Sequence, residues 1–346
     1  MKRIISLLIL AAALAVPGFT QSDLQPAAIV RLTKSEPITV KQYRTEVERY
    51  EKQAGRALNS TEKRQVLDVM INEKLASQAA ERDKVTITDN EVNQSLQQLK
   101  NELSQTIQRQ PTEAEWAAFI KNQTGLELPA YREQLKKQLL IQKYLMEKKR
   151  DSFSSLKAPT EEEIKNTYSL ARAELVRPET VRFSMIRVPF TDTVSKAKAR
   201  EIVDRLVREI GNNPAKFDEA VAKGRAPNSE YQAGDGGYLP RNTQAQQKVG
   251  AEFITTAFNL KQGEVSKMIE TSEGFHIIKI TETYEQKDLG LDDVIQPGTR
   301  VTVRDYISSG LQQQQEQELI EKVTQELVAE LRAGNPYQIY ESNLNW

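Results

Sequence analysis

Residues 274–280 read Gly-Phe-His-Ile-Ile-Lys-Ile, and residues 263–266, shortly before them, read Gly-Glu-Val-Ser. The first segment has the composition of a β-strand, in which successive side chains point to opposite faces. His276 alternates with Ile278 and Ile280, so these three side chains are expected to share one buried face. The pattern fits two interpretations: a core histidine satisfied by its neighbours, or a catalytic histidine.

The chain around this strand predicts a compact α+β domain over residues 177–285. Apolar residues recur there in two ways, as an unbroken strand-like run and at the spacing of a helix. The expected elements are strands at 181–188 and 274–280, and helices through Ile202–Ile210, from Asn213-Pro214 and over 251–260. Strands and helices mixed irregularly over this length are typical of an α+β domain.

Residues 21–176 predict an all-helical domain that opens with one short strand at 28–32. Helix starts are marked by capping boxes, in which Thr or Asn is followed three residues later by Glu. They occur at Asn59–Glu62, Thr88–Glu91, Thr112–Glu115 and Thr160–Glu163. A further long helix is expected from about Pro129.

The C-terminal part is expected to return to this helical domain. Residues 286–300 contain Asp, Gly and Pro and are interpreted as a linker. Residues 301–346 carry an apolar ladder on a terminal helix, formed by Leu319, Val323, Leu327 and Leu331. A helix this amphipathic must bury its stripe. Packing onto the N-terminal helical domain would make the 177–285 domain an insertion.

Residues 1–20 predict a signal peptide. Met1-Lys2-Arg3 is cationic, residues 4–16 are apolar and uncharged, and Pro17-Gly18 ends the apolar stretch. This stretch is too short to span a bilayer, and no later segment is apolar enough to do so. We therefore expect export to the periplasm without stable insertion into a membrane.

The composition excludes several classes of function. With 48 basic and 48 acidic residues, the chain has no bulk charge that would attract nucleic acid. The absence of cysteine and the single histidine exclude disulfides, thiolate metal centres and His-rich zinc sites. Gly234-Asp235-Gly236-Gly237 lacks the Lys-Ser/Thr of a phosphate loop and the carboxylates of a calcium loop, so we interpret it as a turn. No metal and no cofactor is expected.

Residues 178–285 resemble the parvulin (PpiC-type) family of peptidyl-prolyl isomerases. The blocks that carry the resemblance are Ala233–Leu239, Phe253, Ala257-Phe258, Gly263–Ser266, Thr271 and Gly274–Lys279. The helical block before them is similar to the N-terminal domain of SurA-type chaperones, so the chain as a whole resembles SurA/PrsA-type folding factors. The resemblance implies a four-stranded antiparallel sheet with surrounding helices, and a shallow apolar cleft that holds a proline ring without metal or cofactor.

The resemblance transfers the family's site residues only in part. The first strand of the family usually reads V-R-x-S-H-I, whereas here Met185 stands in the place of that histidine. Methionine offers no useful hydrogen bond to a histidine partner. The usual Cys or Asp before the glycine loop is missing from residues 226–229. His276 corresponds to the family's second histidine. The implied contacts with substrate are Val249, Phe253, Phe258 and Thr271. Phe253, Phe258 and Met185 are also compatible with a purely structural place in the core.

Two functions from different classes remain open. In the first, the protein is an exported chaperone that binds unfolded polypeptides, with outer-membrane protein precursors as the expected clients. Its parvulin-like domain would then have a degenerate catalytic centre, as the lost histidine and acid suggest. In the second, it is an active peptidyl-prolyl isomerase whose apolar cleft suffices for catalysis. A hydrolase is disfavoured because the sequence has no nucleophile–base signature.

Overall fold

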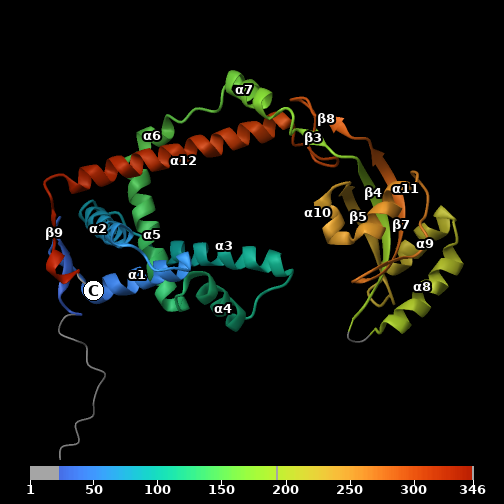
Figure 1. The fold of residues 1–346 in the computed structure, drawn as a ribbon, viewed down its shortest axis with the longest axis horizontal. Coiled ribbons are helices and arrows are strands. Elements are labelled where there is room, and N and C mark those ends of the chain that lie inside the picture. The colour runs from blue at the N-terminus through green and yellow to red at the C-terminus, as the bar shows by residue number, and fades with distance from the viewer. Residues whose placement is uncertain (1–22, 192–193, 345–346) are drawn as a thin grey trace, which may run out of the picture. The chain divides into compact units, whose positions relative to one another are not determined.

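The computed structural model describes residues 23–191 and 194–344 and divides the chain into two compact units (Figure 1). The helical unit combines the chain up to Leu156 with the chain from Gln315 onward. The insert unit is Lys157–Gln314. The predicted signal peptide, residues 1–20, lies outside the described residues. Within the described ranges, no helix has the length and apolar character needed to cross a membrane.

The helical unit contains a small antiparallel sheet and a set of packed helices. Its elements are β1 (Pro26–Val30), β2 (Glu36–Thr39), α1 (Val40–Ala54), α2 (Ser60–Arg82), α3 (Asp89–Ile107), α4 (Glu113–Thr124), α5 (Leu128–Lys148), α6 (Arg150–Ser154), the second half of α12 (Val303–Arg332), β9 (Tyr337–Ile339) and a short 3₁₀ turn (Glu341–Asn343). The strand order is β2-β1-β9. The strand predicted at 28–32 is β1, which begins and ends two residues earlier.

All four predicted capping boxes are present. In each, the cap side chain accepts a hydrogen bond from the backbone three residues later, and the Glu side chain there accepts one from the cap backbone. A further box, formed by Thr39 and Gln42, begins α1. Helix starts could therefore be read from local sequence, because both partners lie within one turn.

The C-terminal helix packs back on the N-terminal helices, as the apolar ladder predicts. Val323, Leu327 and Leu331 are buried in one cluster with the α2 stripe of Leu67, Ile71 and Leu75. Arg332, at the end of α12, donates to Asp68 Oδ1 at 2.7 Å and to Asn72 Oδ1 at 2.7 Å on α2. Burial of each large aliphatic side chain stabilises the folded helical unit by about 1.5–3 kcal/mol. The packing of α12 against this cluster therefore holds the two ends of the chain together.

The insert unit contains the predicted four-stranded antiparallel sheet. Its elements are α7 (Glu161–Ala171), β3 (Val176–Arg177), β4 (Thr180–Pro189), α8 (Lys196–Ile210), α9 (Pro214–Gly224), β5 (Gln232–Pro240), α10 (Thr243–Val249), α11 (Ala251–Asn259), β6 (Ile269–Thr271), β7 (Gly274–Tyr284), β8 (Lys287–Asp288) and the first half of α12. The sheet order is β5-β4-β7-β6, with β4 and β7 in the centre. The α+β fold class is therefore confirmed.

The two faces of this sheet pack against different helices. Ile186, Val188, Phe275 and Ile277 are buried with residues of α8 and α9. Phe183, Ile278 and Ile280 are buried with Phe253 and its neighbours on α11. Successive residues of β7 therefore enter two separate cores, one beneath α8 and α9 and one beneath α11. His276 lies on the α11 side, as Ile278 and Ile280 do.

The turn predicted at Gly234–Gly237 is wrong. These residues lie inside β5, which pairs with β4 along its length. Ser184 is opposite Asp235 and Phe183 is opposite Gly237, so Gly236 is an extra residue in a β-bulge. Glycine is a common turn signal, whereas here Gly236 allows the backbone to approach the Phe183 ring closely.

Residues 286–300, interpreted from the sequence as a linker, contain ordered structure. β8 pairs with β3, and Leu289 is buried in a cluster with Ile164, Val303 and Ile307. A turn closed by the Thr299 N–H donating to the Gln296 carbonyl connects β8 to α12. The cluster fixes the start of α12 within the insert unit.

One buried polar side chain of the helical unit has a role that its sequence context does not reveal. Gln78 on α2 is almost fully buried, and its Oε1 accepts from the N–H groups of Leu32 and Thr33 at 3.0 Å each. Its Nε2 donates to the Lys34 carbonyl at 3.0 Å. Gln78 therefore satisfies the backbone of the β1–β2 connection.

We expect Gln78→Ala to destabilise the helical unit by about 1–2 kcal/mol, because three backbone groups of the partly buried β1–β2 connection lose their partner. Urea unfolding gives the loss of stability, and amide hydrogen exchange at Leu32 and Thr33 locates it. The matched control is Gln97→Ala on the exposed face of α3, for which a change within about 0.5 kcal/mol is expected. Equal effects of the two substitutions would contradict the assignment.

Candidate functional site

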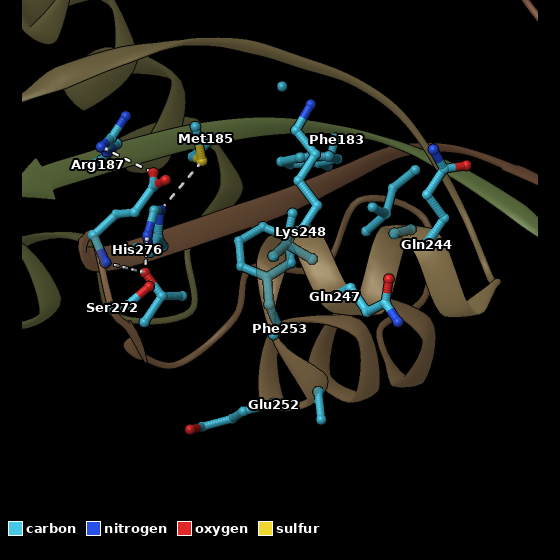
Figure 2. Close-up of a pocket in the computed structure, with 18 of the residues that line it drawn as sticks. Phe183, Met185, Arg187, Gln244, Gln247, Lys248, Glu252, Phe253, Ser272 and His276 are labelled. Carbon is cyan, nitrogen blue, oxygen red and sulfur yellow. Dashed lines mark hydrogen bonds and ion pairs between the residues drawn. The ribbon is translucent and has the colours of Figure 1, made fainter. Parts of the chain in front are cut away.

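A cleft of about 700 Å³ opens on the face of the insert sheet that carries His276 (Figure 2). Its floor is formed by β4 and β7, and its walls by the end of β5, by α10 and α11, and by the β6–β7 turn. The lining side chains used below are Phe183, Met185, Arg187, Tyr238, Val249, Phe253, Thr271, Glu273 and His276. The cleft therefore brings together three segments of the insert unit, residues 183–187, 236–253 and 270–276.

His276 lies at the floor of the cleft with 6% of its surface exposed. Its Nε2 is 2.9 Å from Thr271 Oγ1, and its Nδ1 is 3.3 Å from Met185 Sδ. Figure 2 shows the His276 ring beside the Met185 sulfur. Both interpretations of His276 thus describe part of the arrangement, since the residue is buried and also lines the cleft.

The tautomer of His276 depends on the hydrogen bonds of its two neighbours. A thioether sulfur has no hydrogen and can only accept weakly, so the Nδ1–Sδ contact is favourable when Nδ1 carries the hydrogen. The Thr271 hydroxyl lies within reach of both Nε2 and the Gly274 carbonyl, at 3.3 Å from the latter. When this hydroxyl donates to Nε2, Nδ1 carries the hydrogen and Met185 acts as a weak acceptor, and when it donates to Gly274, Nε2 carries the hydrogen.

Burial, and less strongly the nearby Arg187 guanidinium, lower the pKa of His276 to about 4. Glu273 acts in the opposite direction but less strongly. Arg187 and Glu273 form an ion pair of 3.0 Å at the edge of the cleft, which limits the influence of either charge. His276 is consequently neutral at pH 7, with one nitrogen donating and the other accepting.

Aromatic rings form the apolar wall. The Phe253 ring is 5.5 Å from Phe183 and 5.6 Å from His276, and both pairs meet edge to face. Val249 lies beside them and is half-buried. Such a wall has the apolar character that a proline ring requires.

The sequence-predicted residues are not all in the cleft. Met185, Val249, Phe253, Thr271 and His276 line it together. Phe258 is not among the lining residues, and it packs against the core below α11 with the Arg241 guanidinium 5.3 Å from its ring centre.

Sequence reasoning missed Phe183 and Arg187, which flank Met185 on the same face of β4. Alternation along β4 is the signal that could have identified both, since residues two apart share a face. Glu273 was missed as well. It comes from the turn after β6, whose geometry is not encoded in a local pattern.

Two family profiles match adjoining parts of the chain. Residues 1–145 match the SurA-like N-terminal domain, and residues 159–296 match the PPIC-type PPIase domain. The chain belongs to the SurA/PrsA-like foldase family. It therefore combines a SurA-like N-terminal domain with one PpiC-type parvulin domain, in agreement with the resemblance seen in the sequence.

Individual members of this family are distant in sequence. The chain is 24% identical over 307 residues to the foldase protein PrsA of Clostridium botulinum, covering 88% of this chain and 80% of the relative. It is 29% identical over 223 residues to the chaperone SurA of Alcanivorax borkumensis, covering 62% of this chain and 46% of the relative. A solved chain from the SurA-like chaperones PEB4 and Cj1289 of Campylobacter jejuni covers 91% of this foldase and 100% of its own length, with 14% identity and a TM-score of 0.39. A TM-score this low adds nothing to the assignment.

The depressed pKa of His276 makes the stability of the insert unit depend on pH. The histidine is protonated below about pH 6.5 when unfolded and below about pH 4 when folded. Its contribution is therefore fully present above about pH 6.5 and is lost as the pH falls toward 4, by up to about 3 kcal/mol. Urea unfolding at pH 7, 5.5 and 4.5 measures this loss.

His276→Gln serves as the comparison, because glutamine stays uncharged and still forms hydrogen bonds. Carboxylates that titrate in the same range affect both proteins equally. The variant is expected to lose less stability than the wild type between pH 7 and 4.5. The same pH dependence in both proteins would show that His276 does not have a low pKa.

A second prediction concerns the floor of the cleft. A Cβ atom on Gly236 would lie 2.2 Å from Cε2 of Phe183, so Gly236→Ala must displace the ring that supports Phe253. We expect a loss of about 1–3 kcal/mol in insert stability, as for other overpacked cores. Gly234→Ala on the same strand is the control, since its Cβ would meet nothing within 4 Å. Thermal unfolding compares the two, and indistinguishable melting temperatures would argue against the packing role.

Proposed function

We propose that this foldase is an exported chaperone that binds unfolded polypeptides, and that its parvulin domain holds proline-containing segments with little catalysis. The observation that carries the proposal is the environment of His276. Both ring nitrogens contact uncharged atoms, Thr271 Oγ1 and Met185 Sδ. The ring is thereby engaged on both sides by partners from its own domain.

The chemistry of proline isomerisation gives this observation its weight. The barrier to rotation about the amide is about 20 kcal/mol, and catalysis must favour the twisted amide over the planar one. Polar groups aimed at the twisting bond can supply such preference. Here Thr271 Oγ1 contacts His276 Nε2 and the Gly274 carbonyl, and His276 Nδ1 contacts the Met185 sulfur, so these polar groups face one another. The apolar wall of the cleft remains available to a proline ring, and such a wall supports binding more than catalysis.

The helical unit offers a second surface suited to unfolded chains. A groove of about 830 Å³ lies between α3, α5 and α6. Its walls mix apolar side chains, Ile87, Leu139, Met146 and Phe153, with the amides of Gln94, Gln98 and Gln142. Met146 is 52% exposed. Flexible apolar side chains next to amides that can hydrogen-bond a peptide backbone are suited to binding peptides with broad specificity and modest affinity.

The finer parts of the proposal rest on the sequence and on the names of relatives. The relatives in C. botulinum and A. borkumensis are called a foldase and a chaperone. The predicted signal peptide supports export to the periplasm. Outer-membrane protein precursors are the proposed clients because exported barrels must cross this compartment unfolded.

An active isomerase is the second candidate. The cleft favours it through its apolar seat, where Val249, Phe253 and Phe183 surround a space large enough for a proline ring. Shape and exclusion of water can lower a rotational barrier without charged groups.

Val249→Asn separates the two candidates in the full chain. It places an amide on the cleft wall, and the half-buried position limits the cost to the core. Under our proposal, the wild type shows weak binding of an Xaa-Pro peptide with little acceleration in NMR exchange spectra, and the variant loses about tenfold in affinity. Aggregation of an unfolded outer-membrane barrel is suppressed equally by both proteins.

The matched control is Val207→Asn on the exposed face of α8, which should behave as the wild type in each assay. Strong acceleration by the wild type and by Val207→Asn, lost in Val249→Asn, would replace the chaperone proposal with the isomerase. Failure of every protein to suppress aggregation would reject the chaperone.

A further inference from the structure

The sulfur chemistry of this chain is confined to its five methionines, because it contains no cysteine. Met185 is the one whose sulfur contacts the site histidine, with Sδ 3.3 Å from His276 Nδ1. It also lines the proline cleft. We propose that Met185 is a sulfoxidation site through which hydrogen peroxide weakens the binding of proline segments. The effect on binding rests on the proposed function, whereas the oxidation itself does not.

The geometry leaves part of the Met185 side chain open to the cleft. A thioether sulfur has two lone pairs, and His276 Nδ1 lies against one side of it at 3.3 Å. The side chain is half-buried and lines the cleft. Figure 2 shows the sulfur next to the His276 ring. Peroxide in the cleft therefore approaches the sulfur from the side that a proline ring would occupy.

The other described methionines lie outside the proline cleft. Met70 and Met268 are half-buried like Met185 and pack against hydrophobic clusters of the helical and insert units, but neither lines the cleft. Met146 is 52% exposed on the helical unit and is expected to oxidise faster than Met185. Oxidation of Met146 leaves the cleft unchanged, so it provides an internal reference for the strength of the treatment.

The reaction is a two-electron oxygen transfer. The sulfur lone pair attacks one peroxide oxygen, the O–O bond breaks, and an S–O bond forms. The second oxygen takes up a proton and leaves as water. The sulfur is oxidised to the sulfoxide and the peroxide is reduced, with no metal or cofactor required.

The product changes the cleft in two ways. The sulfoxide oxygen is a strong hydrogen-bond acceptor where a weak one stood, and it projects into the apolar seat beside Phe183 and Phe253. A proline ring would have to desolvate this oxygen without offering it a donor, because proline has no N–H. The His276 N–H also gains a stronger acceptor within reach. Both effects hold the site in a form that excludes proline.

The test uses the full chain treated with dilute hydrogen peroxide. Mass spectrometry of proteolytic fragments reports oxidation at Met185 and Met146 separately. NMR titration with a short Xaa-Pro peptide reports affinity before and after treatment, and about a tenfold loss is expected. The ring resonances of His276 give a third readout, which needs no assignment by mutation because the chain has one histidine.

Two volume-conserving variants identify the responsible residue. Met185→Leu has no sulfur at the site, so its affinity, at whatever level it starts, should not change with peroxide. Met70→Leu, which lines neither the cleft nor the groove, should lose affinity on treatment as the wild type does. Treatment that oxidises Met146 and leaves Met185 reduced would overturn the proposal. Oxidation of Met185 with unchanged His276 resonances and unchanged affinity would do the same.

The same experiment gives a different result if the proposed function is wrong while Met185 is still a sulfoxidation site. If the untreated chain does not bind the peptide, proline binding in the cleft is rejected. The site assignment is then decided by the other two readouts. Sulfoxidation of Met185 with a shift of the His276 ring resonances supports it, and their absence refutes it.

Discussion

The antiparallel pairing of β4 with β7 is the constraint on which the site depends. Met185 lies opposite Ile278 and Arg187 lies opposite His276, so the histidine and the methionine are diagonal neighbours on one face. Their side chains meet although 91 residues separate them in the chain. A slip of one residue in this register would move His276 to the α8 face and replace it with an isoleucine. The two cores on either side prevent such a slip, because each strand presents apolar residues to both.

This pairing explains why His276 has properties of both a core residue and a site residue. The strand buries it among isoleucines, and burial keeps the imidazole neutral. The neighbouring strand supplies sulfur, and the edge strand β6 supplies the Thr271 hydroxyl. The neutrality of His276 and the position of its ring are therefore consequences of the sheet. They do not require a dedicated acid or a second histidine.

The features that sequence predicted are those determined within a turn or a strand. Capping boxes such as Thr88–Glu91 join residues of one helical turn, and the alternation of His276 with Ile278 is a property of one strand. The features that it missed depend on partners distant in the chain. Gly236 is explained by the Phe183 ring, and Gln78 by the backbone near Leu32. The position of Phe258 outside the cleft depends on which side of α11 meets the sheet, and the sequence pattern alone does not determine that.

The packing of α12 has a consequence for the order in which the foldase itself is made. The core of the helical unit requires Val323, Leu327 and Leu331, which the ribosome adds after the whole of Lys157–Gln314. The insert unit, in contrast, consists of one continuous stretch. Domains generally fold as units while synthesis proceeds from the N-terminus. The domain that begins first is thus completed last. α2 can already pack on α1, α5 and β1, but the side of the core that Val323, Leu327 and Leu331 cover stays open until the final helix emerges.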